Sequence, residues 1–576
     1  MKDLKTKRGI ITDCFIYVIF ITMPLFYTDL YFNISSDKWA FFTIASIIYV
    51  FLILALLLLD KTPESSVWFD NLGLIEWTAV VFIATQILST LLSVDKGESF
   101  IGASSRHHGL ANYLIYILLL FIIRKQDINP KRLMPLLAFI GGFEGVFSTL
   151  QFLTFDLLGM YTGARKDSVL SFISTIGNIN FFAGFLTMTT PLSIYLFISE
   201  KRVRMQILYG ICMVSQFAGG LACGADSFYL GLFAGLFIMV FAGGLKLREY
   251  RRLPFALMLA GICDYILSKV SSGLRDKQYV FSASLKENGA GPISVRNLSG
   301  ITAKLADLNF LRTFIFAMAA VYAIMVVVCE LFPEEKEEPE AEIQAESQKG
   351  AGSETRTDTK ESTAIGSNGD LPGNRFKIKN TQGIIVLSVC GAILLAAMIL
   401  VFVKPPFNDD FGTHRGFVWK LGIKDYKSMP LYRKIIGYGQ ETVLGVFNGK
   451  YYDYMVSHQN VVYDNVHCEP LQYLITTGIL GLAAYLTFIG SVLTSLINRV
   501  KSDRSMNLFL IPVFSYFIQS YVNIAQTAGT SIFFLIIALG LNHMRTNNHT
   551  RTNNHTGTDN HTKTDNHTGT DKKADA

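Results

Sequence analysis

The sequence is poor in charge and in cysteine. Asp, Glu, Lys and Arg make up only 17% of its 576 residues, whereas hydrophobic residues make up 50%. The seven cysteines are odd in number and include no C-x-x-C pair, which argues against a disulfide framework and against a zinc cluster. The chain also lacks an H-E-x-x-H motif, so its histidines do not have the spacing of a zinc hydrolase.

Apolar residues are abundant and gather in blocks of roughly 18 to 25, about the length that crosses a bilayer core. These blocks predict an all-α, polytopic transmembrane helical bundle of about 12 to 14 spans. The first block, from about Gly9 to Thr28, is too long for the core of a signal peptide and has no small-residue cleavage site, so we expect it to be retained. The other spans are expected to begin near Trp39, Trp77, Gly109, Leu133, Ile176, Gln206, Ser227, Pro254, Leu311, Gly383, Leu471, Leu508 and Gly529.

Lysine and arginine give the orientation of the bundle, because they accumulate on the cytoplasmic side of short loops. In a bundle of about 14 spans, one side receives the tail and five basic segments, 1–8, 124–132, 200–204, 246–252 and 498–504. Both termini are therefore predicted to be cytoplasmic, in a multi-pass membrane protein. Segments 93–109, 156–169 and the long loop 404–470 are predicted to lie outside, and a fourth outer segment, 269–309, depends on the weak span from Pro254.

Composition divides the chain into four regions. Residues 1–332 form an N-terminal transmembrane region, and residues 333–380 are a charged, aromatic-free insert that we expect to be disordered and cytoplasmic. Residues 381–543 form a C-terminal transmembrane region that carries the long outer loop. Residues 544–576 contain four similar six-residue units in a row, RTNNHT, RTNNHT, GTDNHT and KTDNHT, and are expected to be a disordered tail.

Five of the ten histidines lie in the tail or, like His543, next to it. The other five all fall in predicted outer loops, namely His107, His108, His414, His458 and His467. In the long loop, the apolar residues Phe417, Val418, Leu421 and Ile423 fit a short helix at the membrane interface, with a basic face toward anionic headgroups. A solvated basic loop explains the same charges. Any chemistry of the chain is thus expected on its outer face.

His467 stands immediately before an expected helix that begins near Pro470, with Cys468 or Glu469 at its cap. The positive end of a helix attracts phosphate oxygens and disfavours imidazolium, so we expect His467 to be neutral and able to accept a proton. A neutral base beside an anion site suits transfer from a phosphorylated donor. A purely structural histidine before a helix is the alternative.

Two segments carry a resemblance: HRGFVWKLGIKDYKSMPLYRKIIGYGQET and DNVHCEPLQYLITTGILGLAAYL. They resemble the signature of the O-antigen ligase and polymerase superfamily of bacterial envelope glycan assembly. That signature has an arginine–glycine before a tryptophan helix, a glycine-rich turn, and a histidine followed by leucine–glutamine and a Gly-x-x-Gly helix. The matching positions are Arg415, Gly437, Gly439, His467, Leu471, Gln472, Gly478 and Gly481.

The resemblance extends toward the N-terminus. SVDKGESFIGASSRHHGLANYL resembles the first outer loop of the family, with Arg106 before Gly-Leu, and STIGNINFFAGFL resembles its Gly-Asn-x-Asn span entrance, with Asn178 and Asn180. One departure is that CGADSFYLG, with Asp226, stands where many members have a serine–arginine. If a second arginine helps to hold the donor there, Arg106 or Arg165 must replace it.

The resemblance implies a GT-C-like membrane glycosyltransferase of the bacterial cytoplasmic (inner) membrane that needs neither metal nor cofactor. Such an enzyme transfers a glycan from an undecaprenyl-diphosphate-linked donor to the hydroxyl of a glycan, lipid or protein acceptor, among membrane lipids and without nucleic acid. His467 and Arg415 are the implied catalytic residues, serving the acceptor and the diphosphate respectively. The implied substrate-binding residues are Arg106, Arg165, Asn178, Asn180, Arg433 and Gln472.

A membrane transporter of a small solute or a lipid-linked intermediate is the main alternative. Glu144 lies near the middle of an expected span, where an ionisable residue is costly and often functional. Gln151 on the same helix face or Gln86 on another span are its expected polar partners. No internal repeat or pair of corresponding broken helices is evident, which weakens this alternative.

Overall fold

The computed structural model describes residues 2–60, 72–162, 170–275, 298, 300–331 and 408–561. Within these ranges the chain is helical, apart from one antiparallel pair of two-residue strands, β1 (Phe172–Ile173) and β2 (Gly177–Asn178). The all-α fold class is thereby confirmed for the part of the chain that the structure describes.

The helices of the N-terminal region are α1 (Lys2–Tyr17), the π-helix η1 (Val18–Thr22), α2 (Met23–Leu25), α3 (Ile34–Leu59), α4 (Leu74–Leu91), α5 (Lys96–Ile101), α6 (Leu110–Ile123), α7 (Pro130–Phe152), α9 (Ile179–Ser199), α10 (Val203–Cys223), α11 (Asp226–Ala242), α12 (Leu247–Arg275), α14 (Gly300–Leu305) and α15 (Leu308–Leu331). The helices of the C-terminal region are α18 (Phe411–Ser428), α19 (Leu431–Ile436), α20 (Val443–Gln459), α21 (Glu469–Thr476), α22 (Gly478–Val500), η3 (Arg504–Met506), α23 (Asn507–Gln519), η4 (Ser520–Val522) and α24 (Thr527–His561).

Eleven helices of the described ranges are long and apolar enough to cross a membrane, and α6 and α11 are shorter apolar helices. This is a multi-pass membrane protein. The span that looked weakest, from Pro254, belongs to the 29-residue helix α12. The predicted span from Gly383, the insert 333–380 and the first part of the long outer loop lie outside the described residues.

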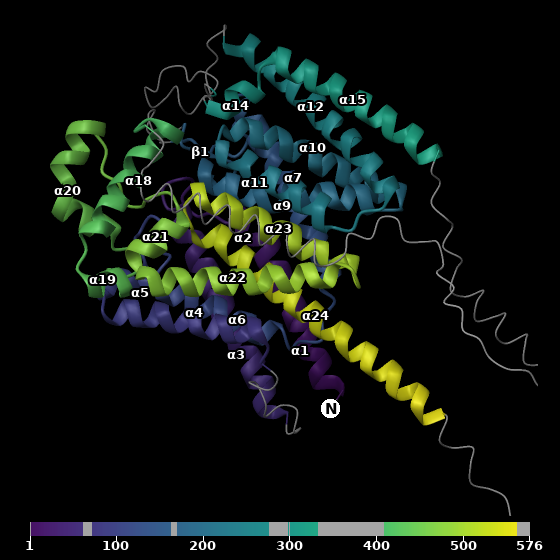
Figure 1. Ribbon diagram of the computed structural model, residues 1–576, viewed down its shortest axis with the longest axis horizontal. Coiled ribbons are helices and arrows are strands. Elements are labelled where there is room, and N and C mark those ends of the chain that lie inside the picture. The colour runs from purple at the N-terminus through teal and green to yellow at the C-terminus, as the bar shows by residue number, and fades with distance from the viewer. Residues whose placement is uncertain are drawn as a thin grey trace, which may run out of the picture.

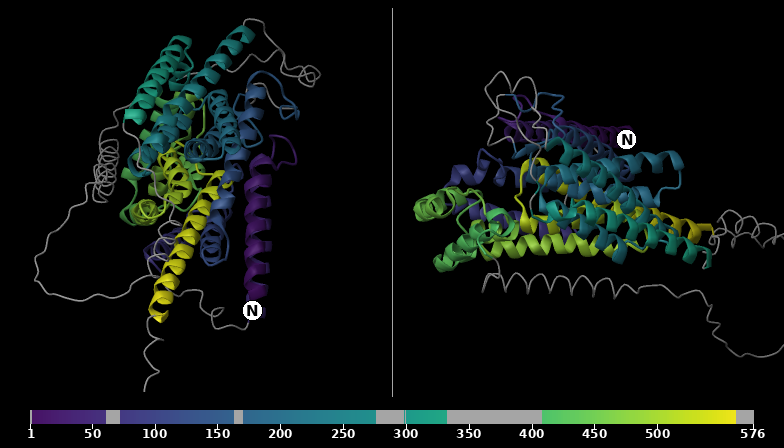
Figure 2. Two further views of the ribbon diagram at one scale, coloured as in Figure 1. Left: turned by 90° about the vertical axis from the view of Figure 1, so that its right-hand side faces the viewer. Right: turned by 90° about the horizontal axis from the view of Figure 1, so that it is seen from above.

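The loop-bearing elements gather at one end of the bundle (Figure 1). There α5, α14, β1 and α18 to α21 lie together, whereas the N-terminus and the last turns of α15 and α24 lie away from them (Figures 1 and 2). We call this the loop end. The segments that meet at the loop end are segments that the sequence predicts on one and the same side of the membrane. In the bundle itself, α9 and the part of α24 up to Thr546 are buried, whereas α15 is almost wholly exposed.

A break divides the span that the sequence predicts from Leu471. The short helix α21 ends at Thr476, and α22 starts at Gly478, whose φ of +67° is in the left-handed region. The carbonyls of Ile475 and Thr476 accept hydrogen bonds from the backbone N–H groups of Tyr438 (3.1 Å) and Gly439 (2.8 Å). The glycine-rich turn of residues 437–439 therefore satisfies the carbonyls that the break leaves free.

Helix α18 confirms the predicted helix of the long loop, but its predicted place at the membrane interface is wrong. Phe417, Val418 and Leu421 are buried in a second, smaller core, packed with side chains of α20, α21 and the loop before α21. Burial against protein removes the apolar face that a membrane-surface helix needs.

Helix α24 also differs from its prediction. It continues to His561, so the first copies of the six-residue repeat are helical where the sequence predicts a disordered tail. A helix already nucleated by an apolar span adds further residues at little cost, even when they are polar. Residues 562–576 lie outside the described ranges.

Candidate functional site

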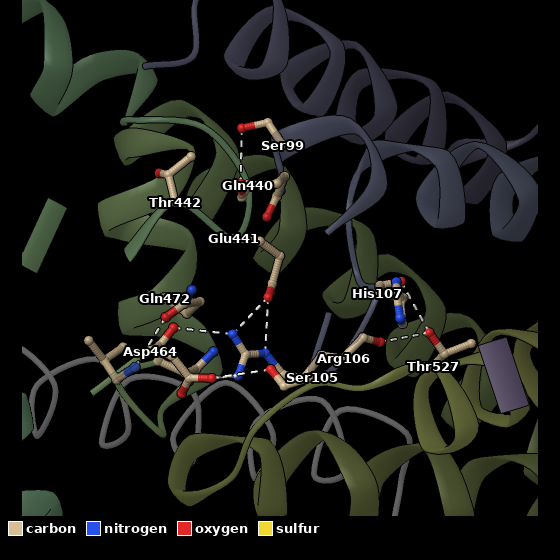
Figure 3. A network of polar contacts seen from close by, with 12 residues as sticks. Ser99, Ser105, Arg106, His107, Gln440, Glu441, Thr442, Asp464, Gln472 and Thr527 are labelled. Atoms are coloured by element: carbon tan, nitrogen blue, oxygen red, sulfur yellow. Dashed lines mark hydrogen bonds and ion pairs between the residues drawn. The ribbon is translucent and has the colours of Figure 1, made fainter. Parts of the chain in front are cut away.

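Arg106 joins three loops at the loop end of the bundle (Figure 3). Its Nε donates to Glu441 Oε2 (2.9 Å), its Nη1 donates to Asp464 Oδ2 (2.6 Å), and its Nη2 donates to the Asp464 carbonyl (3.1 Å). The Arg106 side chain is only 3% exposed. Although burial alone would raise the pKa of the Asp464 carboxyl, the Arg106 guanidinium lowers it.

These contacts use the guanidinium of Arg106 within the protein. The backbone carbonyl of Arg106 also accepts a hydrogen bond from Thr527 Oγ1 (3.2 Å), which ties the same loop to the start of α24. Arg106 therefore holds these loops of the loop end together rather than presenting a free cation to a ligand.

Arg415 lies at a different point, where α18 meets the entrance of α9. Its Nη2 donates to Asn180 Oδ1 (3.0 Å) and its Nη1 to the Gly412 carbonyl (2.8 Å). Asn178 caps α9 by accepting from the Asn180 N–H (2.8 Å), and Asn523 Nδ2 donates to the Asn180 carbonyl (2.9 Å). Arg415 and Asn523, which are 235 and 343 residues away from Asn180 in the sequence, therefore both contact Asn180.

The guanidinium of Arg415 retains donor capacity. Its Nε is buried and has no hydrogen-bond partner among the described residues. Burial lowers the pKa of Arg415, which Asp226 partly offsets. A partly buried guanidinium with one unpaired N–H is a group that an anion can satisfy.

His467 stands in the loop immediately before α21, as the sequence predicts. The cap of α21 is Cys468, and the carbonyl of Asn465 lies 3.0 Å from His467 Nδ1. Because a carbonyl can only accept, this contact places the proton on Nδ1 and leaves the lone pair on Nε2. Nε2 has no hydrogen-bond partner among the described residues, so it is available to a ligand.

The environment of His467 keeps its ring neutral. Burial, and next the positive charge of Arg415, lower the pKa of His467 to about 4. Backbone strain marks the same position: His467 has a φ of +54° and Glu441 a φ of +58°. Residues other than glycine rarely adopt this left-handed backbone conformation, and those that do cluster at functional sites.

The titration of His467 gives a first prediction. Diethyl pyrocarbonate modifies neutral imidazole, so its reaction with wild-type His467 should be nearly independent of pH between pH 5.5 and 7.5. An imidazole with the ordinary pKa of about 6.5 is only about one-tenth neutral at pH 5.5. Replacing Arg415 by Gln removes a charge that lowers the pKa of His467, so the rate at pH 5.5 should fall relative to the rate at pH 7.5.

Mass spectrometry of the His467 peptide measures this reaction, and the exposed His458 of α20 serves as the internal reference for the reagent. A wild-type rate at His467 that falls with acid as steeply as that of free N-acetylhistidine would contradict the assignment.

A small polar pocket adjoins the loop that holds His467. Asn465 lines it, together with His108, Tyr113, Gln440, Glu441, Glu469, Gln472, Tyr473, Asn523 and Ala525. Four buried atoms of this lining have no hydrogen-bond partner among the described residues, His108 Nε2, Glu469 Oε2, Gln472 Nε2 and Asn523 Oδ1. The pocket has room for about one water-sized group, which could bind such a mixture of donors and acceptors.

Burial controls the charge of the pocket. It raises the pKa of the Glu469 carboxyl to about 7 and is the main cause that lowers the pKa of His108 to about 3. His108 is thus neutral, and Glu469 can gain or lose a proton near neutral pH.

The remaining predicted site residues are placed as follows. Arg433 donates from Nη1 to the carbonyls of Leu92 (2.7 Å) and Gly437 (3.0 Å), so it fixes the glycine-rich turn to the end of α4. Gln472 Oε1 accepts from the Val466 N–H (3.2 Å) while its Nε2 faces the pocket. Arg165 lies outside the described residues.

Asp226, the departure from the family pattern, has a structural partner. Its carboxylate accepts hydrogen bonds from the N–H groups of Ile301 (3.1 Å) and Thr302 (2.8 Å) and from Thr302 Oγ1 (2.8 Å), at the start of α14. This contact anchors α14 to α11, and no arginine could make it because arginine has no acceptor.

Glu144 is tied to the turn between β1 and β2, and its predicted partners are wrong. It accepts hydrogen bonds from the N–H of Thr175 (3.2 Å) and from Thr175 Oγ1. Gln151 instead accepts from the Ser174 N–H, and Gln86 pairs with Gln440. Seven residues of helix separate Glu144 and Gln151 by about 10 Å, so each reaches a different residue of the same turn.

Sequence reasoning missed Glu441, Asp464, Asn465 and Asn523 as parts of the site. No local pattern signals the first two, because the burial of Arg106 that calls for carboxylate partners arises only when the loops pack. The described residues contain no group of three or more His, Cys, Asp or Glu placed to hold a metal ion.

Comparison with protein-family models finds no match, and neither does comparison with curated proteins.

Proposed function

We propose that the protein transfers a glycan from an undecaprenyl-diphosphate-linked donor to an acceptor hydroxyl on the outer face of the bacterial cytoplasmic membrane, in cell-surface polysaccharide assembly. The observation that carries the proposal is that the positive charge of Arg415, a cation with an unpaired donor, acts on His467, a neutral imidazole with an unpaired acceptor. The resemblance of the surrounding segments to the O-antigen ligase and polymerase superfamily supports it, and with it a GT-C-like fold.

The two residues divide the chemistry. His467 Nε2 takes the proton of the acceptor hydroxyl as its oxygen bonds to the anomeric carbon of the donor sugar. The bond between that carbon and the diphosphate oxygen breaks, its electron pair leaves with the diphosphate, and Arg415 stabilises the negative charge. The proton passes from His467 to the diphosphate or to water, which restores the neutral imidazole.

Electrostatics links donor binding to the base. The positive charge of Arg415 lowers the pKa of His467 in the free protein. A bound diphosphate opposes that charge, so His467 becomes a stronger base once the donor is in place. The polar pocket beside Asn465 has the size and the unpaired atoms to receive the acceptor hydroxyl.

Transfer by the purified protein tests the proposal. The protein in detergent, given a purified undecaprenyl-diphosphate glycan and a hydroxyl acceptor, should form product with a chelator present. A requirement for a divalent metal would contradict it.

In cells, deletion of the gene should shorten or detach the surface glycan and cause the lipid-linked donor to accumulate. Unchanged glycan, with loss of solute uptake instead, would favour a transporter.

Replacing Arg415 by Lys gives a second prediction. Lysine retains the charge but cannot make the planar fork that holds Asn180 and the Gly412 carbonyl and leaves Nε for an anion. The KM for the donor should therefore rise about tenfold or more, because the donor loses one charge-assisted hydrogen bond. The KM for the acceptor should change little. Lys420→Arg, a change at the neighbouring exposed ion pair with Asp409, is the matched control and should leave both constants unchanged.

A further inference from the structure

A patch of apolar side chains stands exposed at the loop end of the bundle, on the short helices α19 and α5 and the residues before α5. We call it the interfacial patch. Its members, with their exposed fractions, are Leu431 (75%), Tyr432 (58%), Ile435 (38%), Val94 (53%), Phe100 (49%) and Ile101 (48%).

Hydrogen bonds fix the patch to the outer end of α4. Arg433 of α19 donates to the Leu92 carbonyl (2.7 Å), and the N–H of Val94 donates to the Tyr438 carbonyl (2.9 Å). Both α19 and α5 contact α4, and both lie at the end of the bundle in Figure 1. The patch is therefore held rigidly at one level of the molecule.

The apolar surface of a membrane span continues into the patch. Helix α4 is one of the candidate spans, and at its end Leu88, Leu91 and Leu92 are 41%, 62% and 46% exposed. The patch begins at Val94, two residues beyond. A surface that is continuous with the lipid-facing side of a span meets the same solvent, which at this level is the boundary between acyl chains and headgroups.

Helix α19 has the side chains of an interfacial helix. Leu431 and Ile435 are one turn apart on one face, and Lys434 lies between them in the sequence, whereas the Arg433 guanidinium is held by the carbonyls of Leu92 and Gly437. A lysine at this level reaches an anionic headgroup while its apolar neighbours enter the acyl region. In water alone, these six apolar side chains at one end of the bundle would stay exposed.

We propose that the interfacial patch inserts into the headgroup boundary of the bilayer that α4 spans, with anionic phospholipid as its partner. The role that the sequence suggests for α18 thus belongs to α19 and α5. Insertion fixes the level of the glycine-rich turn, and through Glu441 that of Arg106, relative to the membrane. The inference holds whether or not the protein is a glycosyltransferase.

Fluorescence quenching in proteoliposomes tests the inference. An environment-sensitive fluorescent amino acid replaces Tyr432 in the full-length protein, and a matched variant carries it at Tyr452 of α20, a tyrosine that is 52% exposed. The vesicles contain phosphatidylethanolamine and phosphatidylglycerol, with or without bromine near the top of the acyl chains. Bromine should quench the probe at position 432 at least threefold more strongly than the probe at position 452.

Equal quenching at the two positions would overturn the proposal. Blue-shifted emission at position 432 that bromolipid does not quench would also overturn it, because a protein surface, such as a second copy of the chain, would then cover the patch. The same probe at Leu431 guards against local disturbance, since Tyr432 lies under the Arg433 guanidinium, 5.2 Å from the ring centroid.

Discussion

Replacing His467 by alanine should lower the rate of glycan transfer by roughly 10²- to 10⁴-fold, the usual contribution of a positioned general base. The acceptor hydroxyl then loses the only group proposed to take its proton. The KM for the donor should change little, because His467 is neutral and the diphosphate is proposed to bind Arg415. Initial rates with a purified donor at saturating acceptor measure the effect.

Backbone strain requires a second variant at this position. His467 has a φ of +54°, a region in which alanine is strained but which asparagine adopts more readily. His467→Asn therefore preserves the loop while it removes the base, and it should be as slow as His467→Ala. His458→Ala removes an exposed histidine of α20 and should retain full activity. Near-normal turnover of His467→Asn would make the role of His467 structural.

The local sequence predicts the main features of the fold. Apolar blocks of span length place the helices within a few residues of their observed starts, as for Trp77 and α4. The pattern could not reveal the break at Gly478, because residues 471–486 contain no charge and no proline and the break depends on the turn of Tyr438 and Gly439. A continuous apolar run predicts that a segment lies in the membrane, whereas hydrogen bonds from a distant loop decide where its helix stops.

The candidate site is predicted in part for the same reason. Local patterns place His467 before its helix and Arg415 on its own helix, and in the structure both lie at the loop end, where Arg415 donates a hydrogen bond to Asn180. The partners of Arg106 are separated from it by 335 and 358 residues, so no local pattern could pair them. Arg106 resembles a ligand-binding arginine in sequence, and its carboxylate partners become apparent only when the loops are packed.

Replacing Arg106 by methionine should destabilise the loop end by about 3–5 kcal/mol, the usual cost of breaking a buried ion pair on one side. Glu441 would remain buried without its cation, and the links from Arg106 to Asp464 and Glu441 would be lost. The thermal unfolding midpoint should fall, and proteases should cut the loops around Glu441 and Asp464 faster. Arg202→Met removes an exposed arginine that pairs with Glu200 and should change neither measurement.

A double variant separates the structural role of Arg106 from donor binding. In Arg106→Met with Glu441→Gln, the buried glutamate charge is gone, and a neutral amide is far cheaper to bury than an unpaired carboxylate. If Arg106 holds the loops, the double variant should recover part of the stability and, with it, part of the transfer rate without a rise in the KM for the donor. Recovered stability with a donor KM still raised tenfold or more would instead assign Arg106 to the diphosphate.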